Sequence, residues 1–382
     1  MDLKAVKSNA YLFACGLYIA AAIVFSSVWG TKPELHLVFT AARGIAYLLI
    51  LAKLGHDFLT RKISPRHLIV MGLVGAFLLL SAYVTKNKNP LIYWVFIIAG
   101  HDIDYRRIIR AALLGHLAGL LLVITSCYAG FVENIEFIRT EGTVRQSLGF
   151  TYTTAAANYF FYTVLLWGVW RQKNISFAEL ALLLAGDAFF FITTDTKSAF
   201  ALTLLYILLL FVLKMVEKLR EFHSWYFIPA LLIAPLCAAF IVWLCAKYDP
   251  EVTWMSRLNG LLTNRLRWGH AGFQSFGVHP LGQFIEWSGM DKDYAAYNYV
   301  DSSFVQILLN FGPVFLLLLL AGMMLYAFSI CRSRNSYLLL AYLLFVVHST
   351  FDPQLILIAY NSFWLAYGFV SENVRRRDIS YA

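Results

Sequence analysis

Charged residues are scarce in this 382-residue chain: Asp, Glu, Lys and Arg make up 14% of it, against 60% of hydrophobic residues. So little charge excludes a water-soluble domain with an ordinary surface. Cysteine is also sparse, and the five cysteines lie within or at the ends of apolar stretches, which argues against a disulfide framework. HExxH, CxxC, GxxxxGK and GxGxxG motifs are absent, which argues against nucleotide-driven chemistry.

Long apolar runs are what the sequence has instead. About twelve of them approach the roughly 20 residues that cross a bilayer, and they predict an all-α, polytopic membrane protein of about 12 transmembrane helices in a single domain, residues 1–382. We expect the first run to be retained as a span and not cleaved as a signal peptide. The predicted spans are 10–29, 35–52, 67–84, 89–100, 111–130, 151–170, 176–193, 197–213, 225–246, 302–330, 337–350 and 354–370.

The net charge of +9 is distributed in a way that indicates topology. With the N-terminus in the cytoplasm, most of the 31 Lys and Arg residues fall in short inner segments, as the positive-inside rule requires. Both termini are therefore predicted to be cytoplasmic, and no nucleic-acid partner is implied. Two predicted outer segments, 131–150 and 247–301, are long enough to indicate a function on the outer face.

Asp301 stands at the threshold of the tenth span, in the stretch "YNYVDSSFVQILLNFG". On a helix that begins there, Ser302, Gln306 and Asn310 recur every four residues and form a polar stripe that a lipid-facing surface would not carry. We interpret the stripe as the lining of a substrate cavity and Asp301 as a catalytic base. The alternative is a helix N-cap, which explains the residues at the helix start but not Gln306 and Asn310.

Four outer cations run against the charge bias: Arg145, Lys197, Arg265 and Arg267. As a group they are predicted to bind a diphosphate, because a guanidinium fork suits phosphate oxygens and neutralises them without a metal. Anchoring to lipid headgroups is the alternative.

Arg43 lies near the middle of the second span, where a charge should face a cavity or a partner. We include it among the diphosphate-binding candidates, and a structural pair with Asp187 is the alternative. Pro353 marks a turn after Asp352, where His348 and Asp352 are predicted to meet at the outer cavity, unless the histidine is a purely structural donor. No metal site is predicted at the "DID" of Asp102–Asp104 or the "DKD" of Asp291–Asp293, and no cofactor is expected.

Five stretches together resemble the Wzy-type polysaccharide polymerases of Gram-positive bacteria, within the group that includes O-antigen polymerases and ligases. The resemblance covers the chain from about residue 30 onward, and the order and spacing of the motifs carry it. The stretches are "TVRQSLGFTYTTAAANYF", "TTDTKSAF", "NRLRWGHAGFQSFGVHPLGQFIEW", "YNYVDSSFVQILLNFG" and "HSTFDPQLILIAYNSFWL".

The resemblance implies a GT-C-like membrane glycosyltransferase with a large outer loop between helices 9 and 10. Such enzymes polymerise oligosaccharide repeats carried on undecaprenyl diphosphate, at the outer face of the bacterial plasma membrane, to build capsule or exopolysaccharide. Asp301 stands where the ligase branch tends to have histidine, and Arg265 and Lys197 stand where the family has arginine. Asn158 is carried over to the substrate cavity on the same basis.

The mechanism that follows is metal-independent transfer with inversion at the anomeric carbon, in which Asp301 accepts a hydroxyl proton and Arg265 stabilises the leaving diphosphate. The expected partners are the lipid-linked oligosaccharide, the bilayer, a flippase and a chain-length regulator. A ligase that moves finished polymer to another acceptor stays open as an alternative, as does a transporter. The large outer loop has no counterpart in the first half of the chain, which argues against transporter repeats.

Overall fold

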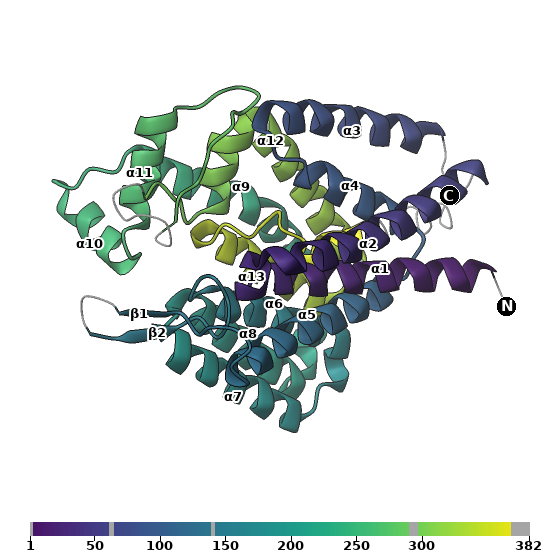
Figure 1. Ribbon diagram of the computed structural model, residues 1–382, viewed down its shortest axis with the longest axis horizontal. Helices are drawn as coiled ribbons and strands as arrows, with labels where there is room; N and C mark the ends of the chain where they lie inside the picture. Colours follow the sequence, from purple (N-terminus) through teal and green to yellow (C-terminus); the bar gives the residue numbers. More distant parts are fainter. Residues whose placement is uncertain (1–2, 61–64, 139–141, 290–296, 368–382) are drawn as a thin grey trace.

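The chain is almost wholly helical in a computed structural model that describes residues 3–60, 65–138, 142–289 and 297–367 (Figure 1). Two short strands, β1 (Glu136–Ile138) and β2 (Val144–Gln146), pair as an antiparallel hairpin. The α-helices are α1 (Leu3–Phe25), α2 (Pro33–Leu59), α3 (Pro65–Thr85), α4 (Asn89–Ala99), α5 (Tyr105–Tyr128), α6 (Ala155–Arg171), α7 (Phe177–Thr194), α8 (Lys197–Met215), α9 (Phe227–Ala246), α10 (Thr253–Leu261), α11 (Arg265–Phe276), α12 (Ser303–Arg332) and α13 (Ser336–Phe351). The 3-10 helices include η1 (Val28–Thr31), η2 (Gln172–Asn174), η3 (Glu217–Arg220), η4 (Ser224–Tyr226) and η6 (Ser362–Ala366).

Eight of the described helices are long and apolar enough to cross a bilayer: α1, α2, α3, α5, α7, α8, α9 and α12. Two further apolar helices, α4 and α13, are shorter. Large apolar side chains on the spanning helices point outward, among them Leu37, Ile192 and Leu317, as a hydrocarbon solvent allows. The prediction of an all-helical, polytopic membrane protein is confirmed at this level.

Helix α6 lies at the centre of the bundle. Thirteen of its 17 residues are buried, and it packs against α5, α7, α8 and α13. A helix that is apolar on all sides is expected in such a position. The first turns of α6 therefore hold the buried Asn158 firmly in the interior, close to the end of the bundle where the long loops lie.

Helix α12 is broken at Gly312, whose φ of 84° is not helical. Pro313 has no N–H, so the carbonyl of Leu309 loses its normal helical donor. The large loop before α12 replaces the missing bonds: Gln283 donates its side-chain Nε2 to the Leu309 carbonyl at 3.2 Å and its backbone N–H to the Asn310 carbonyl at 2.9 Å. The loop and the helix are thus joined by shared backbone hydrogen bonds.

The predicted twelfth span, 354–370, is not a membrane helix over its described residues. Residues 353–361 form turns and a short irregular stretch, and η6 follows. Leu355, Ile358 and Phe363 are fully buried, and the Trp364 indole donates to the Leu355 carbonyl at 2.8 Å. The segment is apolar because the bundle encloses it, and hydropathy alone does not distinguish that burial from exposure to lipid.

The two long predicted outer segments lie at one end of the bundle. Figure 1 shows the β1–β2 hairpin and the pair α10–α11 together at the left, whereas α1 begins at the opposite end. Asp301 ends the second of these segments, and Asp352 follows α13, which runs toward the same end. The candidate active site is built where these segments converge.

Candidate active site

Asp301 lies just before Ser302, which is the N-cap residue of α12. Ser302 has an extended backbone and its hydroxyl accepts a hydrogen bond from the Val305 N–H at 3.4 Å, which is typical of an N-cap serine. Because Ser302 caps the helix, the Asp301 carboxylate takes no part in the cap. Its side chain is partly buried and lines a cavity.

The cavity has a volume of about 310 Å³, at the lower end of the range for small-molecule sites. Its walls combine two carboxylates, several hydroxyls and an aromatic surface. The lining residues are Ser26, Thr151, Tyr152, Thr154, Ala155, Trp287, Gly289, Tyr297, Tyr299, Asp301, Asp352, Pro353, Gln354 and Tyr360. They come from the connections after α1, before α6, before α12 and after α13, so the cavity forms only when the whole bundle is assembled.

Asp352 is the second carboxylate of the cavity, and three side chains approach it. Its Oδ1 lies 3.6 Å from Nη2 of Arg265, the first residue of α11. Its Oδ2 accepts a hydrogen bond from the Ser198 hydroxyl at 3.1 Å and lies 3.7 Å from Nε2 of His348. The Ser303 hydroxyl donates to its backbone carbonyl at 2.6 Å, which ties Asp352 to the start of α12.

His348 is fully buried beneath Asp352, one helical turn back on α13. Its Nε2 lies 3.1 Å from Oδ1 of Asn158, and since an amide oxygen only accepts, Nε2 carries the proton. The imidazole ring stacks on Phe161 with 4.5 Å between ring centres. Asn158 and His348 therefore support Asp352 from below and do not line the cavity.

Arg145 reaches the same region from β2. It is buried, and it donates from Nε to the Thr194 carbonyl at 2.7 Å and from Nη2 to the Thr196 hydroxyl at 3.4 Å. These bonds fix the guanidinium between the hairpin and the α7–α8 connection. Arg145 is also close enough to Asp301 for its charge to lower the pKa of that carboxyl.

The electrostatics of Asp301 combine burial with two cations and one anion. Burial is the largest influence, and the pKa of Asp301 is raised to about 6. Arg265 and Arg145 each lower that pKa, and the neighbouring Asp352 raises it. Burial likewise raises the pKa of Asp352, against the lowering effects of Arg265, Ser198 and Asn158. A carboxylate that titrates near neutrality is suited to accepting a proton.

The raised pKa of Asp301 gives a pH-dependent prediction. A base is active in its ionised form, so the rate of any reaction that Asp301 assists is expected to rise with pH through about 6 and level off above 7. At pH 5 only about a tenth of the carboxyl is ionised, and the rate should fall about tenfold from its plateau. Initial rates between pH 5 and 8, with recovery on return to pH 7.5 as the control for denaturation, measure this effect. A rate that stays constant from pH 8 to pH 5 would contradict the assignment.

The other predicted diphosphate-binding cations lie outside this group. Arg267 is exposed and packs over the Trp268 ring at 5.3 Å, because two residues along α11 place it on another side of the helix from Arg265. Lys197 is exposed at the start of α8, although its neighbours Thr196 and Ser198 both serve the site. Neither lines the cavity.

Arg43 is also absent from the cavity walls. It packs on Phe25 with 4.4 Å between the guanidinium carbon and the ring centre, and Nε donates to the Phe39 carbonyl at 3.4 Å. The alternative pairing with Asp187 is wrong, because no ion pair joins the two described side chains and the buried Oδ2 of Asp187, on α7, has no hydrogen-bond partner. An aromatic face and a backbone carbonyl instead stabilise this charge within the membrane.

The polar stripe of α12 does not line the cavity as predicted. Ser302 caps the helix, and Gln306 lies behind the cavity wall beside Tyr299. Asn310 is buried at the break in α12, where its carbonyl bonds to Gln283. The four-residue spacing correctly predicts an inward-facing side of the helix, but the large loop covers that side.

The aromatic wall of the cavity is not among the features predicted from the sequence. In "YNYVD", Tyr299 stands two residues before Asp301 and Tyr297 stands four residues before it. Alternate residues of an extended chain point to the same side, so all three side chains face the cavity. Trp287 packs edge-on against Tyr299 with ring centres 6.1 Å apart. The period-two aromatic pattern beside the aspartate was the signal that would have found this wall.

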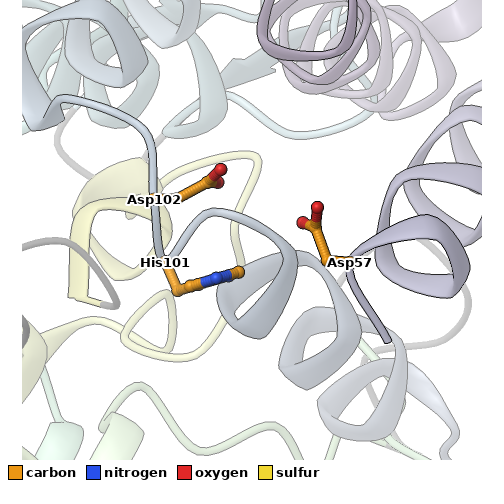
Figure 2. Close-up of side chains that lie close together, drawn as sticks. All are labelled: Asp57, His101 and Asp102. Atoms are coloured by element: carbon orange, nitrogen blue, oxygen red, sulfur yellow. The ribbon is translucent and has the colours of Figure 1, made fainter. Parts of the chain in front are cut away.

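A second cluster of ionisable side chains lies near the other end of the bundle, where α2 ends and α4 connects to α5. The Asp57, His101 and Asp102 side chains bring ligand-type atoms within 4.8 Å of one another, and Figure 2 shows the two carboxylates pointing toward the same space. The Lys53 ammonium bonds to both carboxylates at 2.7 Å. Its positive charge offsets one of the two negative charges, and it takes the place of a cation beside both carboxylates, so we assign the cluster as an ion-pair network. The "DKD" of 291–293 lies outside the described residues.

Replacing Lys53 tests how much this cluster contributes to the free energy of unfolding. Lys53→Met should lower the free energy of unfolding by about 3–5 kcal/mol, because it leaves the Asp57 and Asp102 carboxylates without the charge that compensates their burial. Unfolding midpoints in detergent micelles measure the effect, with the exposed Lys88→Met as the matched control. Adding Asp102→Asn should recover part of the loss, whereas unchanged stability in Lys53→Met would show that the network is not stabilising.

No protein-family model matches this chain, and no curated protein or solved structure matches it either. The fold and composition define the class, a polytopic α-helical membrane protein. Fold alone does not define a function, so the function is inferred from the residues of the candidate active site.

Proposed function

We propose that the protein is a membrane glycosyltransferase that polymerises saccharide units carried on a lipid diphosphate, of the Wzy-type kind that the sequence resembles. One observation carries the proposal: the Asp301 carboxylate, whose pKa is about 6, lines a cavity at the loop-bearing end of the bundle, and Arg265 and Arg145, which lie outside the cavity lining, are close enough for their charges to lower that pKa. Glycosyl transfer from a diphosphate requires a base and a positive charge together, and Asp301 with Arg265 and Arg145 would supply them.

The aromatic wall supports a saccharide as the ligand. Flat apolar rings with polar edges suit sugar rings, which present C–H groups on one face and hydroxyls around the rim. Trp287, Tyr297 and Tyr299 would contact the face, and the hydroxyls of Thr151 and Thr154 would bond to the rim. The volume of about 310 Å³ suits a short saccharide segment at the reacting position, with the rest of the chain outside.

In the reaction, an acceptor hydroxyl attacks the anomeric carbon of the donor sugar from the side opposite the diphosphate. A new C–O bond forms there, the bond from that carbon to the diphosphate oxygen breaks, and the configuration inverts. Asp301 takes the hydroxyl proton, and Arg265 stabilises the negative charge on the departing lipid diphosphate. The energy is held in the sugar–phosphate bond that breaks, so the residues described need no nucleotide for this step.

The position of the cavity meets the demands of a lipid-linked donor. It lies where the membrane helices end, so the lipid tail can stay in the bilayer while the sugars extend into water. At the other end α6, α8 and α12 carry Arg171, Lys214 and Arg332 in their last turns. By the positive-inside rule we place that end in the cytoplasm and the cavity at the outer face of a bacterial plasma membrane.

Purified protein in detergent, incubated with the native lipid-linked repeat unit, tests the proposal. We expect a ladder of lengthened lipid-linked saccharides and one released lipid diphosphate for each new glycosidic bond, measured by gel electrophoresis and mass spectrometry. Micelles do not separate two compartments, so transport cannot occur in them, and lengthening there excludes a transporter. If the protein instead moves preformed polymer to another acceptor without lengthening it, the ligase alternative is correct. If neither product forms, the proposed function is wrong.

A further inference from the structure

Arg265 occupies an unfavourable place for a cation. It is the first residue of α11, where the unpaired N–H groups and the helix dipole repel positive charge. The two residues before it, Thr263 and Asn264, have φ values of 52° and 66°, so the chain enters the helix through a constrained turn. A long side chain at such a point needs an anion to hold its guanidinium in one direction.

Asp352 is the anion that faces Arg265, and its two carboxylate oxygens have separate partners. Oδ1 lies toward Nη2 of Arg265 at 3.6 Å, and Oδ2 is held by the Ser198 hydroxyl at 3.1 Å, with Nε2 of His348 at 3.7 Å. The approach of Arg265 to Asp352 is an ion pair, and the hydrogen bond of Arg265 to a described side chain runs from Nη1 to the Thr263 hydroxyl at 3.2 Å. Ser198 therefore orients the carboxylate, and the carboxylate orients the arginine.

The backbone of Asp352 is fixed as well. The Ser303 hydroxyl donates to its carbonyl at 2.6 Å and accepts from the Leu355 N–H at 3.0 Å. Ser303 is two residues after Asp301, so this clamp sets the two carboxylates in a fixed relation. Asp301 differs from Asp352 in that no described side chain donates a hydrogen bond to its carboxylate, which leaves Asp301 open to a substrate.

We infer that Asp352 is the positioning residue for Arg265: its carboxylate, oriented by Ser198, directs the guanidinium toward the leaving group, while Asp301 alone acts as the base. The inference rests on the proposed function for the identity of the leaving group, but the Asp352–Arg265 contact can be tested without it. Positioning of this kind matters because small displacements of a catalytic charge cost large factors in rate.

Site-resolved arginine modification is the test. The full-length protein in detergent is treated with phenylglyoxal, and modification of Arg265 is measured by mass spectrometry relative to Arg267, an exposed arginine two residues away on the same helix. In Asp352→Asn, which removes the negative charge and keeps the shape, the Arg265 to Arg267 ratio should rise about fivefold. Asp352→Glu should return most of the protection, because it restores the charge.

Ser198→Ala keeps both charges and removes one hydrogen bond, so it should raise the same ratio by about twofold. It decides the question if Asp352→Asn fails to fold. In the transfer assay Asp352→Asn should lower kcat with little change in KM, and adding Arg265→Ala should cause little further loss, since the two residues act as a unit.

The outcomes separate this inference from the proposed function. An unchanged labelling ratio in Asp352→Asn, or in Ser198→Ala where Asp352→Asn does not fold, overturns the positioning role even if the wild type polymerises saccharides. A raised ratio supports the role even if the wild type transfers no saccharide, in which case the proposed function alone fails.

Discussion

Asp301→Asn is expected to leave the protein folded in the membrane and to lower the rate of saccharide transfer about 10²- to 10⁴-fold, the range that a general base contributes. The amide has the size of the carboxylate but cannot accept the proton of the attacking hydroxyl. No described side chain donates a hydrogen bond to Asp301, and the adjacent Ser302 caps the helix independently. The substitution therefore removes the chemistry and leaves the packing of α12 intact.

The effect of Asp301→Asn is measured with purified protein and the lipid-linked repeat, and in cells as accumulation of single repeats on the carrier lipid. Glu136→Gln is the matched control, because Glu136 is an exposed acid on the hairpin at the same end of the bundle. The control should polymerise at the wild-type rate. Polymer of normal length and rate from Asp301→Asn would remove Asp301 from the mechanism.

Arg265→Ala is the second substitution with a large expected effect, about 10²- to 10³-fold in rate, as is typical when a group that stabilises developing negative charge is lost. It also leaves Asp352 without its cation. Arg265→Lys separates the two consequences, since an ammonium keeps a charge beside Asp352 but cannot present the planar fork to two phosphate oxygens. We expect the lysine variant to keep wild-type abundance and to recover only part of the rate.

The chain provides its own control for Arg265 in Arg267, which is exposed and packs on Trp268. Arg267→Ala should stay within about twofold of the wild-type rate, as exposed positions away from a site usually do. Rates are compared at equal amounts of folded protein, judged by gel filtration in detergent. If both alanine variants lose only membrane abundance and keep full specific activity, the outer arginines serve as membrane anchors.

The sequence predicts the helical class and the key charges for different reasons. Apolar runs report the membrane directly, so the long helices are found from composition. Arg265 and Arg145 are found because positive charge on the predicted outer side runs against the topological bias, and Asp301 is found because it stands where a polar stripe enters an apolar run. The structure places Asp301 under the electrostatic influence of Arg265, Arg145 and Asp352, although these residues are far apart in the chain.

What the sequence does not reveal is set by packing between distant segments. Asn158 reaches His348 only because α6 and α13 pack together in the interior, whereas the approach of His348 to Asp352, one turn apart at the end of α13, is predicted from the sequence. Arg267 and Lys197 carry the same charge as Arg265 but face elsewhere, which residue type alone does not indicate. The segment 354–367 is apolar for enclosure within the bundle, and its hydropathy therefore looks like that of a span.

The hydrogen bonds from Gln283 to the interrupted helix α12 have a consequence for how the protein is made. Residue 283 is synthesised before α12, and in the orientation proposed above the loop crosses the membrane before α12 settles into place. Until Gln283 reaches the carbonyls of Leu309 and Asn310, those groups lie in a nonpolar surrounding without donors, a state that costs several kcal/mol. We expect a variant without the loop to insert α12 less completely, because the two carbonyls lose their donors.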